Sequence, residues 1–184
     1  GDTSSGYWNE TEAIALMVRS ALTTGALPEL DERPSWLPVD LCAKAVVELS
    51  LPSFTTASRE LDSVLVYHLV NPQTFSFKHD LLPALNNCSD MPPFDIVNPS
   101  EWLERLSNSE QDPEKNPSIK LIDFWRRKYG GAAVSVAEDD EPAGLTFDTS
   151  KTIQDCPSLA HVRDPVSVGL AKKYVEVWLK RWLS

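Results

Sequence analysis

The side chains that could do chemistry in this chain are few and scattered. Of the three histidines, His68 lies inside an apolar run, whereas we expect His79 on the solvated face of a helix and His161 in a loop. A single histidine in an apolar strand is more often a core residue than a general base. The sequence contains no glycine-rich dinucleotide loop, P-loop, His-Glu-x-x-His motif or Gly-x-Ser-x-Gly elbow. No complete catalytic constellation is therefore visible.

His68 belongs to the stretch Ser63–Pro72, which is rich in β-branched and large apolar residues and stops at Asn-Pro. Because the apolar run is continuous rather than alternating, it predicts a strand that is covered on both faces. Ligands of open α/β sheets tend to lie beyond the carboxyl ends of such strands. This placement puts Tyr67, His68 and Asn71 at the edge of a candidate site.

Helical periodicity accounts for most of the remaining chain. Asn9 and Asp40 are suitable N-caps for two early helices, and Gly25 is a suitable end for the first. Ser76 and Asn98 could cap later helices. The predicted fold is a helix-rich α/β arrangement of about six helices with few short strands. Its elements are a helix up to residue 24, a helix over 40–49, the strand over 63–72, a helix after residue 76, a strand over 94–97, a helix pair over 98–130 and a closing helix over 165–182.

Composition limits the partners. The 184 residues carry a formal net charge of −10, which argues against nucleic acid because that partner requires a basic face. No apolar run is long enough to cross a bilayer and no signal peptide opens the sequence, so we expect a cytoplasmic protein without a membrane partner. We expect one domain over 1–184, with a flexible acidic loop over 131–144. The three widely spaced cysteines predict reduced structural thiols, namely Cys42, Cys88 and Cys156.

A local basic cluster interrupts this acidic chain. Arg126, Arg127 and Lys128 lie near the end of a helix predicted from Ser118 to Tyr129. Cations are favourable at a helix C-terminus, so the cluster could be purely structural. It could equally be a docking surface for an acidic partner. The same helix is expected to bury the apolar residues Leu121, Ile122, Phe124 and Trp125.

Several separated pieces of the sequence together resemble the thioester reductase domains of nonribosomal peptide synthetases and related megasynthases. These domains are of the extended short-chain dehydrogenase/reductase type, and the likeness is strongest to fungal adenylate-forming and synthetase-like reductases. No single piece is very specific, but the ordered set covers nearly the whole chain. The pieces are Gly1-Asp2 with Gly6 and Trp8-Asn9, Trp36–Asp40, Val66–Pro72, Glu101–Leu103 with Leu106, Asp112-Pro113, Asn116-Pro117, Lys120-Leu121, and Lys173–Val175 with Trp178-Leu179.

The resemblance implies that this chain is the C-terminal, substrate-binding portion of such a domain, with an incomplete Rossmann sheet. The nucleotide motif and the Tyr-x-x-x-Lys pair would lie before Gly1, in a missing N-terminal Rossmann half. NADPH would bind to the parent domain and not to this chain alone, which would be inactive. Its partner would be an acyl or peptidyl carrier in cis, whose phosphopantetheine thioester is released as an aldehyde or alcohol.

The resemblance assigns no catalytic residue to this chain. It implies instead a substrate-binding role for residues that line the acyl or pantetheine tunnel, and it makes Arg126, Arg127 and Lys128 candidates for carrier docking. The central strand would be expected to pair near the missing sheet, and without that sheet it could self-associate with a second copy. The candidate substrate-binding residues are Trp8, Asn9, Trp36, His68 and Asn71.

Two other functions remain open at this point. The parent could release its product by Dieckmann-type cyclisation without reduction. Alternatively, the chain could be a module that binds a carrier or partner and never meets a cofactor.

Overall fold

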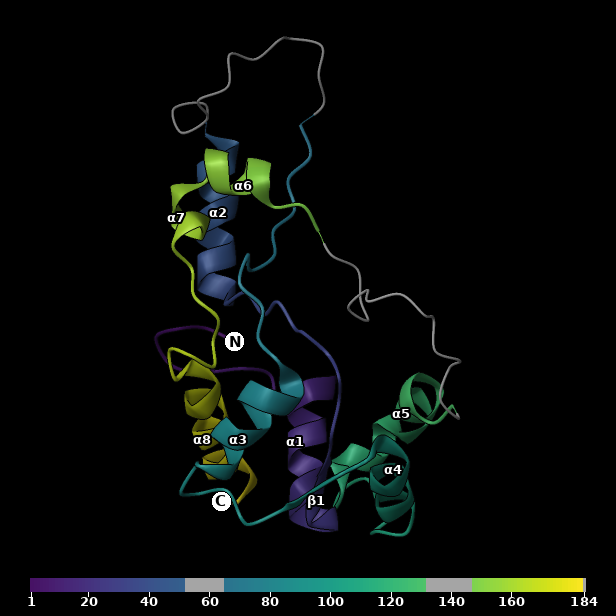
Figure 1. The fold of residues 1–184 in the computed structure, drawn as a ribbon. Helices are drawn as coiled ribbons and strands as arrows, with labels where there is room; N and C mark the ends of the chain where they lie inside the picture. Colours follow the sequence, from purple (N-terminus) through teal and green to yellow (C-terminus); the bar gives the residue numbers. More distant parts are fainter. Residues whose placement is uncertain (52–64, 132–146, 184) are drawn as a thin grey trace.

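The computed structural model of the protein describes residues 1–51, 65–131 and 147–183 (Figure 1). Within these residues the predicted helix-rich α/β fold is confirmed, with eight α-helices rather than six and a two-stranded parallel sheet. In chain order the elements are α1 (Ala13–Thr24), β1 (Ala26–Pro28), α2 (Val39–Ser50), a π-helical turn η1 (Phe77–Leu81), α3 (Leu82–Asn86), β2 (Asp95–Val97), α4 (Pro99–Ser107), a 3-10 turn η2 (Pro117–Leu121), α5 (Ile122–Tyr129), α6 (Ser150–Asp155), α7 (Pro157–Ala160) and α8 (Leu170–Trp182).

A large apolar core joins α1, α3, α4, α5 and α8. Helix α1 ends as predicted at Gly25, whose φ of 64° is in the left-handed region that glycine tolerates. On the α4 side, Trp102 is fully buried and its ring centroid lies 5.0 Å from that of Trp125 in α5. Its indole Nε1 donates to Ser20 Oγ of α1 at 2.9 Å, so the polar end of this large side chain is satisfied inside the core.

The two strands hold the ends of the core helices together. β1 pairs in parallel with β2, with Leu27 opposite Ile96 in the register. β2 was predicted by its alternation, whereas the three-residue β1 was not. Because parallel strands need a long crossover connection, the chain between them can accommodate α2, η1 and α3.

A second, smaller apolar cluster lies apart from the large core. Figure 1 shows α2, α6 and α7 grouped at one end of the molecule, with α1, α3 and α8 at the other. Among the described residues, the buried members of this small cluster are Ala45, Cys156, Leu159 and Val162. Glu48 of α2 holds α7 in place, because its carboxylate accepts from Cys156 Sγ at 3.1 Å and from the N–H and hydroxyl of Ser158.

The predicted strand over 63–72 is wrong for the part of it that the structure describes. Residues 65–72 are irregular, with bends at Val70 and Pro72, and belong to no sheet in the described chain. The side chains alternate rather than being covered on both faces, and Val66 is 66% exposed. The segment is held instead by α6, since His68 N donates to Thr152 Oγ1 at 3.2 Å. A continuous apolar run favours a strand, but a strand also needs a neighbouring strand with which to form hydrogen bonds. The described chain offers none to this segment.

The closing helix begins at Leu170 and not at residue 165. Gly169 has a φ of 75°, which a right-handed helix cannot include, so the turn before it stays separate from α8. Asp164 forms that turn by accepting from the N–H groups of Val166 and Ser167. Val168 lies in this turn and is exposed.

Several smaller predictions were also wrong. Glu12, not Asn9, precedes α1, and Pro38, not Asp40, precedes α2. Phe124 is 43% exposed rather than buried. The acidic loop predicted over 131–144 lies outside the described residues from 132 onward. None of the helices in the described residues is long and apolar enough to cross a membrane.

Candidate functional site

An aromatic cluster joins the N-terminal segment to α8. The half-buried Trp8 lies with its ring centroid 4.9 Å from Trp36 and 5.3 Å from Trp178, and its backbone carbonyl accepts from Trp178 Nε1 at 2.8 Å. The indole Nε1 of Trp8 donates to Glu12 Oε2 at 2.8 Å. Trp36 continues the cluster to the buried Phe75, at 4.8 Å between centroids. The polar edge of Trp8 is thus already used within the chain.

Asn71 connects the chain segments that cross between the large and the small apolar clusters. Its side chain is 2% exposed. Its Nδ2 donates to Trp36 O at 3.0 Å and to Arg163 O at 3.1 Å, and its Oδ1 accepts from Gln73 N at 2.9 Å. These bonds leave little capacity for a ligand, so Asn71 fixes the geometry of the crossing rather than facing a substrate.

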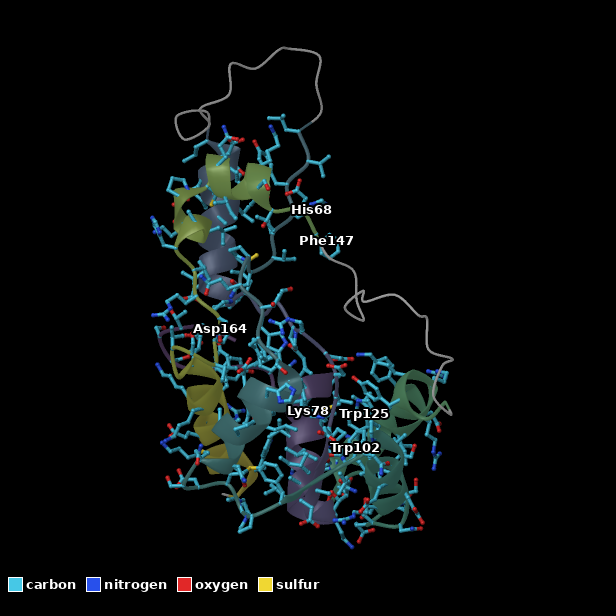
Figure 2. All side chains as sticks on the ribbon, in the orientation of Figure 1. His68, Lys78, Trp102, Trp125, Phe147 and Asp164 are labelled. Carbon is cyan, nitrogen blue, oxygen red and sulfur yellow. The ribbon has the colours of Figure 1, made fainter. Side chains whose placement is uncertain are left out.

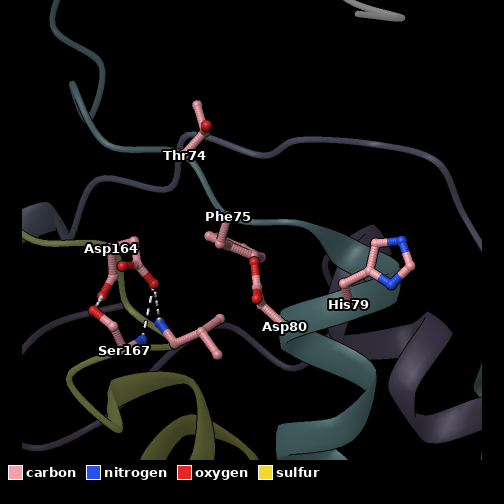
Figure 3. Close-up of a pocket in the computed structure, with 7 residues that line it drawn as sticks. Thr74, Phe75, His79, Asp80, Asp164 and Ser167 are labelled. Atoms are coloured by element: carbon pink, nitrogen blue, oxygen red, sulfur yellow. Dashed lines mark hydrogen bonds between the residues drawn. The ribbon is translucent and has the colours of Figure 1, made fainter.

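A cleft of about 310 Å³ opens beside this crossing (Figure 3). Phe75 lines one side, in contact with Trp36 behind it. One group of lining residues comes from η1 and the loop before it, and another comes from the turn before α8. The full lining is Thr74, Phe75, His79, Asp80, Asp164, Val166 and Ser167.

The cleft presents hydrogen-bond acceptors more than donors. One oxygen of Asp80 accepts from Ser76 N at 2.7 Å, and one oxygen of Asp164 accepts from Ser167 N at 2.8 Å. Burial alone would raise the pKa of Asp164, but hydrogen bonds from Ser167 and Val166 outweigh it and lower that pKa. Asp164 is therefore ionised at neutral pH and suits ligand hydroxyl or amide N–H groups.

None of the five residues predicted to bind substrate lines this cleft, and two of them, His68 and Asn9, also lie outside the network of Trp8, Trp36 and Asn71. His68 is exposed, with Nδ1 3.0 Å from Asp148 O and its ring centroid 5.1 Å from that of Phe147 (Figure 2). Asn9 is exposed in the turn before α1 and accepts from Thr11 N at 3.1 Å. The structure thus brings Trp8, Trp36 and Asn71 into one network and leaves His68 and Asn9 outside it.

The basic residues of α5 differ in how far they are engaged. Arg126 donates to Asp123 at 3.2 Å and to Ser107 at 2.9 Å. Lys128 forms an ion pair with Glu32 at 2.8 Å. Burial alone would lower the pKa of Lys128, but the hydrogen bond to Glu32 opposes it, and the pKa is raised overall. Arg127 is exposed and forms no ion pair with the residues that the structure describes.

No metal centre accompanies the cleft. In residues 1–51, 65–131 and 147–183, no group of three or more histidine, cysteine, aspartate or glutamate side chains is arranged to hold a metal ion.

Comparison with known proteins places these features in context. No family model matches the sequence. A non-reducing polyketide synthase of Aspergillus terreus is 35% identical over 181 residues, which cover 98% of this chain and 6% of that protein. The chain is homologous to a segment of fungal non-reducing polyketide synthases. A second such synthase, from Hypocrea jecorina, is 32% identical over 97% of this chain, as is the 3-methylorcinaldehyde synthase of Talaromyces stipitatus. The chain spans about 6% of the length of each.

A solved structure has the same fold as this chain. The terminal R domain from the myxalamid PKS-NRPS biosynthetic pathway superimposes with a TM-score of 0.68 at 19% identity, covering 98% of this chain and 41% of that domain. The expected likeness to part of such a domain is therefore confirmed at the level of the fold. The sequence resemblance pointed to synthetase-like and adenylate-forming reductases, whereas these relatives are named as polyketide synthases.

The cleft residues His79, Asp80, Asp164 and Ser167 were missed by sequence reasoning. His79 and Asp80 follow the helix cap Ser76, and Asp164 precedes a proline, so each has an ordinary local explanation. They come together in the folded chain, where α3 packs against α8 in the large core and Asn71 bonds the segment before η1 to the segment before α8. No local pattern in the sequence indicates that residues near 79–80 and residues near 164–167 lie together in the fold.

Proposed function

We propose that this chain is the substrate-binding portion of the terminal release domain of a fungal non-reducing polyketide synthase. The parent domain would release a carrier-bound polyketide thioester as an aldehyde, at the expense of NADPH. The observation that carries the proposal is the combination of homology over nearly the whole chain with the fold of a terminal R domain. One of the homologous synthases is named for an aldehyde, 3-methylorcinaldehyde, which favours reductive release over cyclisation.

The cleft between η1 and the turn before α8 is the proposed acyl subsite. Phe75 and Val166 offer apolar contact, and the second oxygens of Asp80 and Asp164 are not used by hydrogen bonds within the described chain. Carboxylates accept hydrogen bonds from hydroxyl groups. The cleft therefore suits an acyl chain that carries hydroxyl groups, and it orients the substrate without supplying a nucleophile.

The same cleft does not fit a nicotinamide dinucleotide. Its described lining contains two carboxylates and neither lysine nor arginine, whereas the cofactor carries phosphates that such carboxylates would repel. The NADPH of the parent domain would accordingly bind to the other half of that domain, and no chemical step is assigned to residues of this chain.

The complete terminal domain of the parent synthase, loaded with an acyl thioester, tests this function. Reductive release predicts one aldehyde formed for each NADPH oxidised, measured by product mass and cofactor absorbance. A cyclised product formed without NADPH oxidation would make the domain a cyclase. Binding of the carrier without turnover of any thioester would make it a binding module.

We further propose that the carrier domain docks on one face of the α5 region. Phe124 and Arg127 are three residues apart in α5, a spacing that places them on one side of the helix, and Lys120 precedes them in η2. Both cations are exposed and form no ion pair with described residues, and Phe124 is 43% exposed. An acidic carrier surface with an apolar contact would complement this face. Of the three cations first predicted to dock the carrier, Arg127 is the one that remains available.

Charge-reversal variants distinguish a docking role of Arg127 from that of its neighbour Arg126, which is already bonded within the chain. Arg127→Glu should raise the KM for a carrier-bound substrate about 10-fold, because electrostatic complementarity acts mainly on association. It should leave turnover of a soluble acyl thioester unchanged. Arg126→Glu, which alters a side chain already bonded to Asp123, is the matched control and should change the carrier KM less. Equal effects of the two substitutions would contradict this docking face.

A further inference from the structure

A short segment after β1 joins α5 to η1. The carboxylate of Glu32 accepts a hydrogen bond from Tyr129 Oη at 3.2 Å and forms an ion pair with Lys128 Nζ at 2.8 Å. These two partners are the last two residues of α5. The backbone carbonyl of Glu32 accepts from the N–H of Phe77, the first residue of η1, at 2.9 Å. Glu32 is therefore bonded through its side chain to α5 and through its backbone to η1.

A second ion pair attaches the same segment to η1. The carboxylate of Glu29 pairs with Lys78, the second residue of η1. The side chains of Glu29 and Glu32 are 38% and 28% exposed, and ion pairs with such exposed members contribute little to the stability of a fold. The segment is therefore better suited to setting the position of η1 than to holding the core together.

The turn η1 has two hydrogen-bond registers available to it. The carbonyl of Ser76 accepts from Asp80 N at 3.0 Å, which is the spacing of an α-helix, and from Leu81 N at 3.1 Å, which is the spacing of a π-helix. Single π-helical turns occur frequently at functional sites. A change of register would turn the side chains of η1 about the helix axis, and two of them, His79 and Asp80, line the cleft.

The other end of this connection is the proposed docking helix. Phe124 and Arg127 lie in α5, and Lys128 follows Arg127 directly. The side chain of Lys128 is 46% exposed, so an acidic group on a bound carrier can reach its ammonium and compete with Glu32 for it. A ligand shifts a conformational equilibrium only through contacts that differ between the two states. Lys128 supplies such a contact, because it bonds either to Glu32 or to the carrier.

We propose that Glu32 is a positioning residue that couples carrier docking on α5 to acyl binding in the cleft. While Lys128 pairs with Glu32, the segment 29–32 holds η1 in its π-helical register. When an acidic carrier group takes Lys128, the segment loosens and the side chains of His79 and Asp80 adjust to the acyl chain. This inference rests on the proposed function, which supplies both the carrier and the acyl chain. It adds that each of the two ligands strengthens the binding of the other by the same factor, because binding linkage is reciprocal.

Calorimetric titration of the complete terminal domain measures this coupling. The probes are a carrier domain without its phosphopantetheine arm, which occupies the docking face alone, and a hydroxyoctanoyl-pantetheine amide. In the unaltered domain, saturating carrier should lower the Kd of the amide at least about 5-fold. Glu32→Gln removes the charge and keeps the shape of the side chain, so the amide alone should already bind with the lower Kd and the carrier should have no further effect. Damage to the fold would instead weaken amide binding. Glu176→Gln, which breaks an ion pair with Lys172 on α8, is the matched control and should leave the coupling unchanged.

Coupling that persists in Glu32→Gln, or an unaltered domain that binds both probes without coupling, would overturn the proposal. Amide hydrogen exchange checks the same residue without either ligand: the amides of Asp80 and Leu81 should exchange at least about 10-fold faster in Glu32→Gln than in the unaltered domain. Equal exchange would also overturn the proposal. Turnover of a carrier-bound thioester, measured on the same samples, keeps the two proposals separate. Coupling without release of aldehyde would reject the release function alone, and release of aldehyde without coupling would reject the role of Glu32 alone.

Discussion

Replacing Asn71 by alanine is the sharpest structural perturbation that the fold offers. The substitution removes three hydrogen bonds, to Trp36 O, Arg163 O and Gln73 N, at a position where the side chain is 2% exposed. A hydrogen bond within a protein contributes about 1 kcal/mol net, so the three bonds account for about 3 kcal/mol of the free energy of unfolding. Carbonyl groups left without a partner near the crossing would add to this cost.

Urea denaturation of this 184-residue chain measures the effect directly. Asn71→Ala should lower the midpoint at an unchanged slope, because the surface exposed on unfolding stays nearly the same. Asn9→Ala is the matched control: Asn9 is exposed and bonds only within its own turn, to Thr11, so its loss should cost under about 1 kcal/mol. A cost for Asn71→Ala no larger than that for Asn9→Ala would refute the role of Asn71 as the tie between the crossing segments.

Three further predictions follow from the described contacts. Ser20→Ala should destabilise the protein by about 1–3 kcal/mol in thermal or urea unfolding, because the buried Trp102 Nε1 loses its acceptor; no change in stability would mean that this indole finds another partner. The pKa of Asp40 is lowered from its usual 3.8, since hydrogen bonds from Thr3 outweigh the opposing effect of burial. The stability that this carboxylate contributes is therefore present above pH 3.8 and lost as the pH falls below it, and Asp40→Asn should flatten that part of a stability-against-pH curve. Gly169→Ala should cost about 1 kcal/mol because an alanine Cβ disfavours the left-handed backbone, and an unchanged melting temperature would contradict the turn before α8.

Elements that depend on local signals could be predicted from the sequence. Gly25 ends α1 through its positive φ, Ser76 Oγ accepts from His79 N, and Asn98 Oδ1 accepts from Glu101 N. In each case the residue satisfies backbone groups within a few positions of itself. The start of α8 was missed because its position depends on the conformation of Gly169, which the apolar periodicity over 165–182 does not report.

Features that depend on distant contacts could not be predicted. The apolar run that ends at Pro72 indicated a buried strand, but a strand requires a neighbour, and the described chain contains none for it. Asn71 was placed at the edge of a site, and it does adjoin the cleft, but as a buried tie rather than a substrate contact. The cleft itself combines residues near 75–80 with residues near 164–167, which are far apart in the sequence and meet only in the folded chain.

The most direct test of the central proposal is to locate the acyl chain. A carrier domain bearing a photoreactive acyl-pantetheine thioester can be incubated with the complete terminal domain, irradiated and analysed by peptide mass spectrometry. The account predicts cross-links within Thr74–Asp80 and Asp164–Ser167, and their loss when an unlabelled acyl thioester competes. Cross-links confined to regions outside these two segments, while the domain still releases its product, would contradict the assignment of this chain as the substrate-binding portion.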